Sequence, residues 1–206
     1  MRGLFITVEG PDGSGKSTQV ANIKKFFEDR GMDVVLSREP GGTMIGERIR
    51  NIILDKDFKE MDPMTEAMLY AASRSQHVAQ VIAPALNEGK VVVCDRFVDS
   101  SLAYQGFGRN LGEPVAVINS YAVRGYMPDV TFLMKLDPAV GKHRIEESRA
   151  EQDRLEQEKL AFHKRVYEGF LELEKQHPER IVGIDASLPM DRIRDLIYDK
   201  LEELLG

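Results

Sequence analysis

Short apolar segments rich in β-branched residues alternate along the chain with longer segments in which apolar residues recur every three or four positions. The first pattern predicts buried strands and the second predicts amphipathic helices. We expect strands in the runs that begin at Leu4, Asp33, Val91, Asp129 and Arg180. We expect helices over about 17–30, 44–54, 65–88, 99–107, 113–124, 138–149, 154–176 and 189–205. Strands that alternate with helices predict an α/β fold with a parallel sheet covered on both faces.

The domain organisation is predicted to be simple. A chain of 206 residues fits one α/β domain, and no internal repeat, low-complexity tract or Pro/Ser-rich linker marks a second one. We therefore expect residues 1–206 to form a single domain.

Charge and composition exclude several classes of protein. Lys and Arg number 28 against 34 for Asp and Glu, and the net charge of −6 argues against a surface that coats nucleic acid. The first ten residues resemble neither a signal peptide nor a membrane-spanning helix. We therefore expect a cytoplasmic protein with no membrane partner. Cys94 is the only cysteine, lies in an apolar run and is expected to be a buried, reduced thiol.

The most specific motif is a phosphate-binding loop between a predicted strand and a predicted helix. Residues 10–17, GPDGSGKS, fit the pattern G-x-x-x-x-G-K-[ST]. Its backbone N–H groups and the following helix dipole would attract phosphates, Lys16 would reach the β- and γ-phosphates, and Ser17 would offer a hydroxyl to Mg²⁺. The predicted ATP-binding residues are Gly10, Pro11, Asp12, Gly13, Ser14, Gly15, Lys16, Ser17 and Thr18.

A carboxylate follows the third predicted strand. The run VVVCD ends at Asp95, where a side chain can hold Mg²⁺ directly or through water, and Arg96 comes next. In isolation, such an Asp-Arg pair could be a surface ion pair. Beside a phosphate loop, it favours a second component of a nucleotide site.

Further motifs resemble one family. The segments REPGGT at 38–43, AASR at 71–74, DRF at 95–97, SLAYQG at 101–106 and DRLE at 153–156 are similar to those of bacterial thymidylate kinases. The resemblance runs from about residue 4 to about 170. It implies a three-layer P-loop NTPase fold with a five-stranded parallel sheet and a short lid at about 145–156. It also implies a homodimer that transfers the γ-phosphoryl group of ATP to dTMP. Phe97 departs from the Tyr or His common in the family.

Spacing suggests how a base could be read. Tyr70 and Arg74 are four residues apart on one predicted helix, so both project from the same face. A ring can stack on thymine while a guanidinium donates to its O4, although core packing of Tyr70 and a solvated Arg74 are the alternatives. Ser101 and Gln105 repeat this spacing, and the resemblance implies that they contact the base edge.

The resemblance assigns the remaining acceptor contacts. Tyr104 would lie against the sugar where a 2′-hydroxyl would stand, and Asp12 would accept a hydrogen bond from the 3′-hydroxyl. Arg50 and Arg96 would grip the acceptor α-phosphate, and Glu39 would border the same site.

Catalysis by direct in-line attack requires positive charge near the transferring group. Positions 11–14 of the phosphate loop contain no arginine, whereas Arg144, Arg149 and Arg154 cluster where the family has its lid. Arg149 and Arg154 could instead pair with neighbouring glutamates on a solvated surface. The predicted catalytic residues are Lys16, Asp95, Arg96, Arg149 and Arg154.

Two other functions remain open at this point. One is a P-loop kinase for dUMP, dCMP or a deoxynucleoside. The other is a nucleotide-dependent switch that binds a protein partner, although the Asn-Lys-x-Asp signature of GTPases is absent.

Overall fold

The core of the computed structural model, which describes residues 2–148 and 153–206, is a five-stranded sheet with the order β2-β3-β1-β4-β5. All four neighbouring pairs are parallel, as the alternating pattern predicts. The strands are β1 (Phe5–Glu9), β2 (Val34–Arg38), β3 (Val91–Asp95), β4 (Val130–Lys135) and β5 (Ile181–Asp185).

Helices connect successive strands. They are α1 (Lys16–Glu28), α2 (Met44–Leu54), α3 (Pro63–His77), α4 (Ala83–Asn87), α5 (Val98–Ser101), α6 (Glu113–Val123), α7 (Pro138–Ser148), α8 (Leu160–Gln176) and α9 (Met190–Leu205). Two π-helical segments, η1 (Val78–Ile82) and η2 (Leu102–Gly108), continue α3 and α5. None of the helices in the described ranges is both long enough and apolar enough to cross a membrane.

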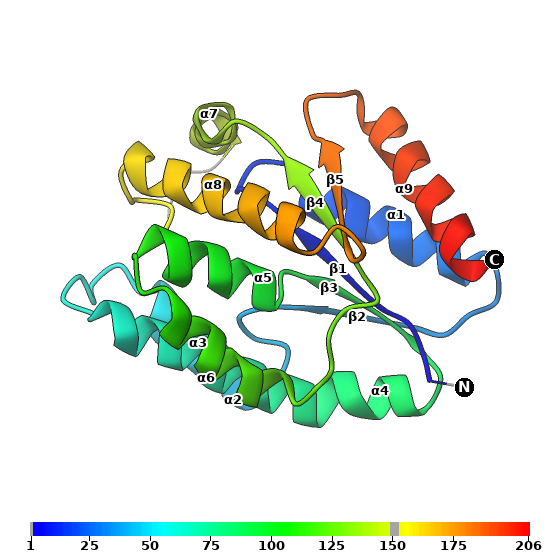
Figure 1. Cartoon of the computed structure of the whole chain (residues 1–206), viewed down its shortest axis with the longest axis horizontal. Helices are drawn as coiled ribbons and strands as arrows, with labels where there is room; N and C mark the ends of the chain where they lie inside the picture. The colour runs from blue at the N-terminus through cyan, green and yellow to red at the C-terminus, as the bar shows by residue number, and fades with distance from the viewer. Residues whose placement is uncertain (1, 149–152) are drawn as a thin grey trace.

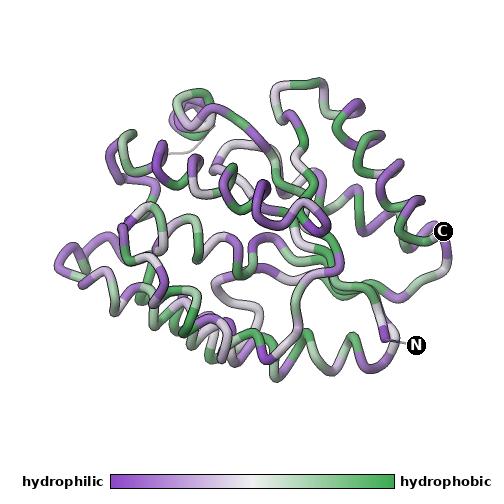
Figure 2. Tube along the Cα trace, in the orientation of Figure 1, coloured by the Kyte–Doolittle hydropathy of each residue, from purple (hydrophilic) through white to green (hydrophobic). Residues whose placement is uncertain are grey.

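Helices cover both faces of the sheet and so form three layers (Figure 1). On one face, the apolar sides of α1 and α9 pack on alternate strand residues such as Ile6, Val8 and Phe132. On the other face, η1 and α4 cover β3, while η2 and α8 cover β4 and β5. Hydrophobic residues accordingly follow the central strands, whereas hydrophobic and polar residues alternate along the outer helices (Figure 2).

Three helix predictions need correction. The predicted helix over 65–88 is interrupted by a π turn next to Pro84, which lacks a backbone N–H. The N–H of the preceding residue, Ala83, donates to the carbonyl oxygen of Val78, five residues back. The helix predicted over 99–107 is mostly π-helical. The helix predicted from 154 begins only at Leu160, because the Asp153 carboxylate accepts hydrogen bonds from the next backbone N–H groups and forms a turn.

The sheet topology brings the sequence motifs together at one edge. Asp95, the last residue of β3, is in register with Val8 of β1 and Arg38 of β2. The loops that follow these three strands therefore meet at the carboxyl edge of the sheet, where ligands bind in open α/β folds.

Candidate active site

The loop between β1 and α1 has the geometry of an anion cradle. Gly10, Gly13 and Gly15 have φ values of 132°, 75° and 85°, which residues with a side chain rarely adopt. A Cβ atom on Gly10 would also collide with the carbonyl oxygen of Met134. The glycines of the motif are therefore required by the backbone path.

The Lys16 side chain lies back over this loop. Its ammonium group donates to the carbonyl oxygens of Gly10 and Pro11 at 3.2 and 2.8 Å, and only 8% of the residue is exposed. Burial, followed by the positive charge of Arg96, lowers the pKa of Lys16 from 10.5 to about 8, while Asp12 partly opposes this shift. A phosphate in the cradle would stabilise the charged ammonium.

Two oxygen ligands stand beside the cradle. The hydroxyl of Ser17 donates to Asp95 Oδ2 at 3.4 Å, and both residues line the cavity described below. Hydroxyl and carboxylate oxygens are ligands that Mg²⁺ accepts, together with water and phosphate oxygens. The two residues thus fit the predicted magnesium site.

Arg96 links the phosphate loop to Asp12 and Tyr104, two of the residues predicted to bind the acceptor nucleotide. Its backbone is left-handed, with φ 68°, and its guanidinium donates to Asp12 Oδ1 at 2.6 Å and to Gly10 O at 2.9 Å. The Tyr104 hydroxyl donates to the other Asp12 oxygen at 3.2 Å. Burial would raise the pKa of Asp12, but Arg96 and then Lys16 outweigh it and hold that pKa well below its usual range.

A fully buried carboxylate, Glu9, supports this arrangement. It accepts hydrogen bonds from the Phe97 N–H at 2.7 Å and from the Ser100 hydroxyl at 2.5 Å. Glu9 therefore holds the segment that follows Arg96 in the chain. Burial and the nearby charge of Asp99 raise the pKa of Glu9 to about 7. Glu9 was not predicted from the sequence, although an acidic residue at the end of an apolar strand was a signal for it.

One cavity of about 330 Å³ joins these groups to the rest of the predicted site. Its lining side chains come from the phosphate loop, the ends of β2 and β3, helices α2 and α3, the η2 segment and the turn before α8. They include Asp12, Lys16, Ser17, Arg38, Glu39, Arg50, Tyr70, Arg74, Asp95, Arg96, Phe97, Tyr104, Gln105 and Asp153. Most of the residues predicted from motifs thus surround a single space.

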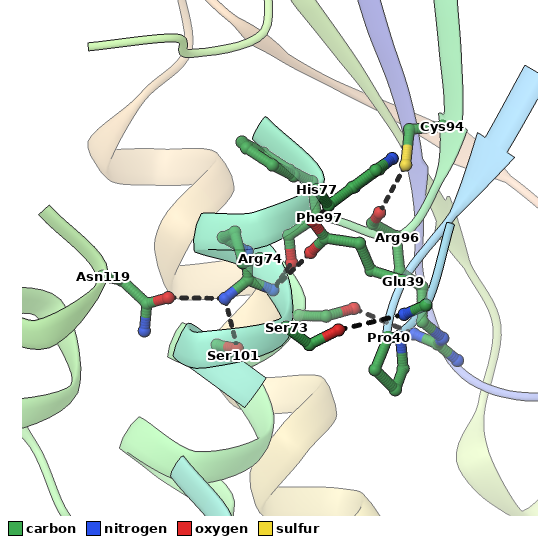
Figure 3. A network of polar contacts seen from close by, with 12 residues as sticks. Glu39, Pro40, Ser73, Arg74, His77, Cys94, Arg96, Phe97, Ser101 and Asn119 are labelled. Carbon is green, nitrogen blue, oxygen red and sulfur yellow. Dashed lines mark hydrogen bonds and ion pairs between the residues drawn. The ribbon is translucent and has the colours of Figure 1, made fainter. Parts of the chain in front are cut away.

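Arg74, which lines the cavity, belongs to a buried network of polar contacts (Figure 3). Its guanidinium contacts Glu39 Oε2 at 2.7 Å and donates to Ser101 Oγ at 2.9 Å, as well as to Asn119 and to the Phe97 carbonyl. Only 1% of Arg74 is exposed, so the alternative of a solvated helix face is wrong. Ser101 lies behind Arg74 and is not among the lining residues.

Two buried polar atoms in this region lack a partner among the described residues. They are Arg74 Nε, a donor, and Gln105 Oε1, an acceptor. Both residues line the cavity. An unpaired buried polar group costs free energy, so such a pair favours a ligand that presents one acceptor and one donor there.

The other predicted acceptor residues also reach the cavity. Arg50 donates to the Pro40 carbonyl oxygen at 2.9 Å, beside Arg38. Burial and the negative charge of Glu66 raise the pKa of Tyr70 well above its usual value, so its hydroxyl stays neutral.

The three arginines predicted to belong to the lid differ in where they lie. Arg144 donates to the Gly13 carbonyl oxygen at 3.3 Å, whereas Arg149 lies outside the described residues. Arg154 donates to Ile53 O at 2.8 Å and pairs with the buried Glu66 at 2.7 Å. It therefore forms an ion pair with a buried residue that is distant in sequence.

Comparisons with known proteins point to one family. A sequence model of a family described as thymidylate kinase matches residues 8–197. The thymidylate kinase of Geobacillus thermodenitrificans is 52% identical over 195 residues, which are 94% of this chain and 87% of that protein. The thymidylate kinase of an Exiguobacterium species is 50% identical over 206 residues, covering 100% of this chain and 97% of that protein.

A solved structure extends the similarity to the whole fold. The crystal structure of thymidylate kinase from Ehrlichia chaffeensis matches with a TM-score of 0.75 at 30% identity, and the match covers 100% of both chains. The family model and the full-length relatives lead to one conclusion: this chain belongs to the thymidylate kinase family.

Proposed function

We propose that this chain transfers the γ-phosphoryl group of ATP to dTMP, giving ADP and dTDP on the route to dTTP. The observation that carries the proposal is the single cavity that joins the phosphate loop at Lys16 to the unpartnered atoms of Arg74 and Gln105. Such a space suits a nucleoside monophosphate whose phosphate lies beside the phosphate loop, where the triphosphate of ATP would bind.

Residues 10–18 would bind the triphosphate of ATP, with Lys16 on the β- and γ-phosphates. Ser17 and Asp95 would hold Mg²⁺, which neutralises charge on the phosphates when bound. Arg50 and Arg96 would bind the α-phosphate of dTMP, because both line the cavity that also contains Lys16 and the base pocket, which is the part lined by Tyr70, Arg74 and Gln105.

The base pocket suits thymine. Arg74 Nε would donate to O4 and Gln105 Oε1 would accept from N3–H, whereas cytosine presents the opposite polarity at both positions. Tyr70 would stack on the ring, and Ser101 would act through Arg74, to which it is hydrogen-bonded. Tyr104 would leave no room for a 2′-hydroxyl on the sugar of the acceptor nucleotide. The Asp12 carboxylate would accept a hydrogen bond from the 3′-hydroxyl, and Glu39 would border the site.

The chain's main contribution to the reaction would be positioning and charge. An oxygen of the dTMP phosphate attacks the γ-phosphorus in line, the bond to the β-phosphate oxygen breaks, and no covalent enzyme intermediate forms. The lid at about 145–156 would bring Arg149 or Arg154 to the transferring group.

The function is tested by measuring ADP release with each deoxynucleoside monophosphate in turn. We expect the highest kcat/KM with dTMP and a lower value with dCMP. A nucleotide-dependent switch is excluded if no ADP is released when the enzyme and ATP are mixed with a protein partner but no acceptor nucleotide. Preference for dUMP or dCMP, or for a deoxynucleoside assayed in parallel, would contradict the proposal and support the rival kinase assignment.

The Gln105→Ala variant is expected to lower the ratio of kcat/KM for dTMP over dCMP by roughly 5- to 150-fold, the equivalent of about 1–3 kcal/mol. The missing amide would no longer accept the thymine N3–H. Arg74→Ala should also lower the ratio, but it would leave the buried Glu39 carboxylate with one partner fewer. An unchanged ratio in both variants would exclude base reading by these residues.

Binding of MgATP is expected to weaken as pH rises above about 8, by up to about tenfold per pH unit. The reason is that the Lys16 pKa is lowered to about 8. Above this pH, the phosphates either bind beside a neutral amine or bind together with a proton that Lys16 takes up from solution. Calorimetric Kd values between pH 7 and 9.5 measure this. Lys16→Arg, which stays charged, should give a flatter profile; equal slopes for both proteins would contradict the explanation.

We also propose a homodimer formed through α2, α3 and α6, which pack side by side (Figure 1). These helices expose large apolar side chains, among them Met44 at 81%, Met68 at 55% and Tyr121 at 78%. Apolar patches of this kind favour protein contacts.

A cytoplasmic location is proposed as well, and the free buried thiol of Cys94 is compatible with it.

Sedimentation velocity tests the dimer. We expect wild type to sediment as a dimer and the Met68→Glu/Tyr121→Glu variant to sediment as a monomer, because two charges per copy would enter an apolar interface. Leu196→Glu, on an exposed part of α9, is the matched control and should remain dimeric. A monomeric wild type at micromolar concentration would refute the proposal.

A further inference from the structure

Gln105 can read thymine N3–H only if its carbonyl oxygen, rather than its amino group, faces the cavity. Nothing in the side chain itself fixes this orientation, because the two ends of an amide have nearly the same shape. In the structure, Gln105 Nε2 donates to Glu66 Oε1 at 2.9 Å, while Oε1 has no partner among the described residues. We propose that Glu66 is a positioning residue that sets the direction of the Gln105 amide and thereby the preference for thymine over cytosine. This inference rests on the proposed function.

The charge of Glu66 makes the orientation one-sided. A carboxylate can only accept hydrogen bonds, so it selects the amino end of Gln105 and turns the carbonyl end away. If Glu66 were replaced by a neutral amide, its own amino group could donate to Gln105 Oε1, and the Gln105 amide could turn over. The cavity would then present a donor, which suits cytosine N3.

Two arginines keep Glu66 ionised although the residue is fully buried. Arg109 donates to Oε1 at 3.2 Å and to Oε2 at 3.0 Å, and Arg154 donates to Oε2 at 2.7 Å. Burial would raise the pKa of Glu66, but hydrogen bonds from Arg109, Gln105 and Arg154 outweigh it and lower that pKa. Because Arg109 spans both oxygens, Oε1 stays oriented toward Gln105 even when Arg154 changes its partner.

The test is the ratio of kcat/KM for dTMP over dCMP in Glu66→Gln. The fraction of folded enzyme cancels in this ratio, so a loss of stability alone leaves it unchanged. We expect a fall of roughly 5- to 150-fold, the range for one hydrogen bond at a buried polar site. Glu158→Gln is the matched control: Glu158 also pairs with Arg109, at 2.5 Å, but no hydrogen bond joins it to Gln105 in the described structure, so the ratio should stay within about twofold.

A double-mutant cycle with Gln105→Ala separates the outcomes. If Glu66 acts through Gln105, Glu66→Gln should have no further effect on the ratio in the Gln105→Ala background. If the two effects add, or if Glu66→Gln alone leaves the ratio unchanged while Gln105→Ala lowers it, the inference is wrong and the proposed function stands. If Gln105→Ala itself leaves the ratio unchanged, base reading by Gln105 fails, and the inference fails with it.

A second variant covers a failure of Glu66→Gln to fold. Glu66→Asp keeps the charge but withdraws the carboxylate by one methylene, so it should lower the ratio less than Glu66→Gln while retaining a single thermal transition. An unchanged ratio in a folded Glu66→Asp protein, if Glu66→Gln does not fold, would overturn the inference.

Discussion

Lys16→Ala is expected to lower kcat/KM for ATP by at least about 10²–10³-fold while the protein remains folded. This range is typical when one preorganised donor to a developing negative charge is removed, and Lys16 carries a full charge. Among the described residues, the ammonium group donates to the Gly10 and Pro11 carbonyl oxygens and lies 3.8 Å from Asp12 Oδ1, so its loss removes polar contacts of the loop and little from the apolar core. Steady-state ADP release and thermal unfolding measure the two parts of this expectation.

The matched control lies on the same helix. Lys24, on α1, forms a surface ion pair with the exposed Glu28, and Lys24→Ala should leave kcat/KM within about twofold of wild type. If Lys16→Ala kept a near-normal rate at saturating MgATP, the donor site would have to be placed elsewhere. An unfolded Lys16→Ala protein would instead show that the lysine is structural.

The parts of the fold that follow from local pattern were predicted well. The five strands were visible because each is a short apolar run, and the runs of the three central strands, β1, β3 and β4, are buried almost throughout, as strands inside a parallel sheet are. The helix breaks were not, because they depend on backbone hydrogen bonds. One break lies beside Pro84, which has no backbone N–H to donate. The other is the turn at Asp153, whose carboxylate accepts from a backbone N–H group that a helix would otherwise use.

The site shows the same division. The phosphate loop, Asp95, Arg96, Arg74 and Gln105 were found because they belong to motifs, and the structure brings them to one cavity. Glu9 and Glu66 were missed, although both are fully buried and hold several of the motif residues in place. Their partners lie about 39–91 residues away in the sequence, so spacing along the chain carries no sign of them.

Removing a lid arginine is expected to lower kcat and kcat/KM together, with little change in the affinity for either nucleotide. This is the signature of an interaction made mainly in the transition state. Arginines that supply such charge in related chemistry contribute about 10³–10⁵ in rate. Arg154→Ala and Arg149→Ala should each show a part of this effect, and the double variant should show most of it.

The structure adds a condition for Arg154. To reach a phosphate it must give up Ile53 O and Glu66, its partners at 2.8 and 2.7 Å. Since Arg109 also pairs with Glu66, the carboxylate would keep a counter-ion when Arg154 leaves. The exchange therefore does not leave an isolated buried charge, which would cost several kcal/mol.

Two measurements distinguish this role from base reading and from a general charge effect. Arg154→Ala should lower kcat with dTMP and with dCMP by the same factor, because the transferring phosphate is common to both reactions. Lys159→Ala removes an exposed cation just before α8 and should change kcat by less than about twofold. If both lid variants and the double variant kept kcat within about threefold of wild type, the catalytic charge would have to come from Arg96, Lys16 and Mg²⁺ alone.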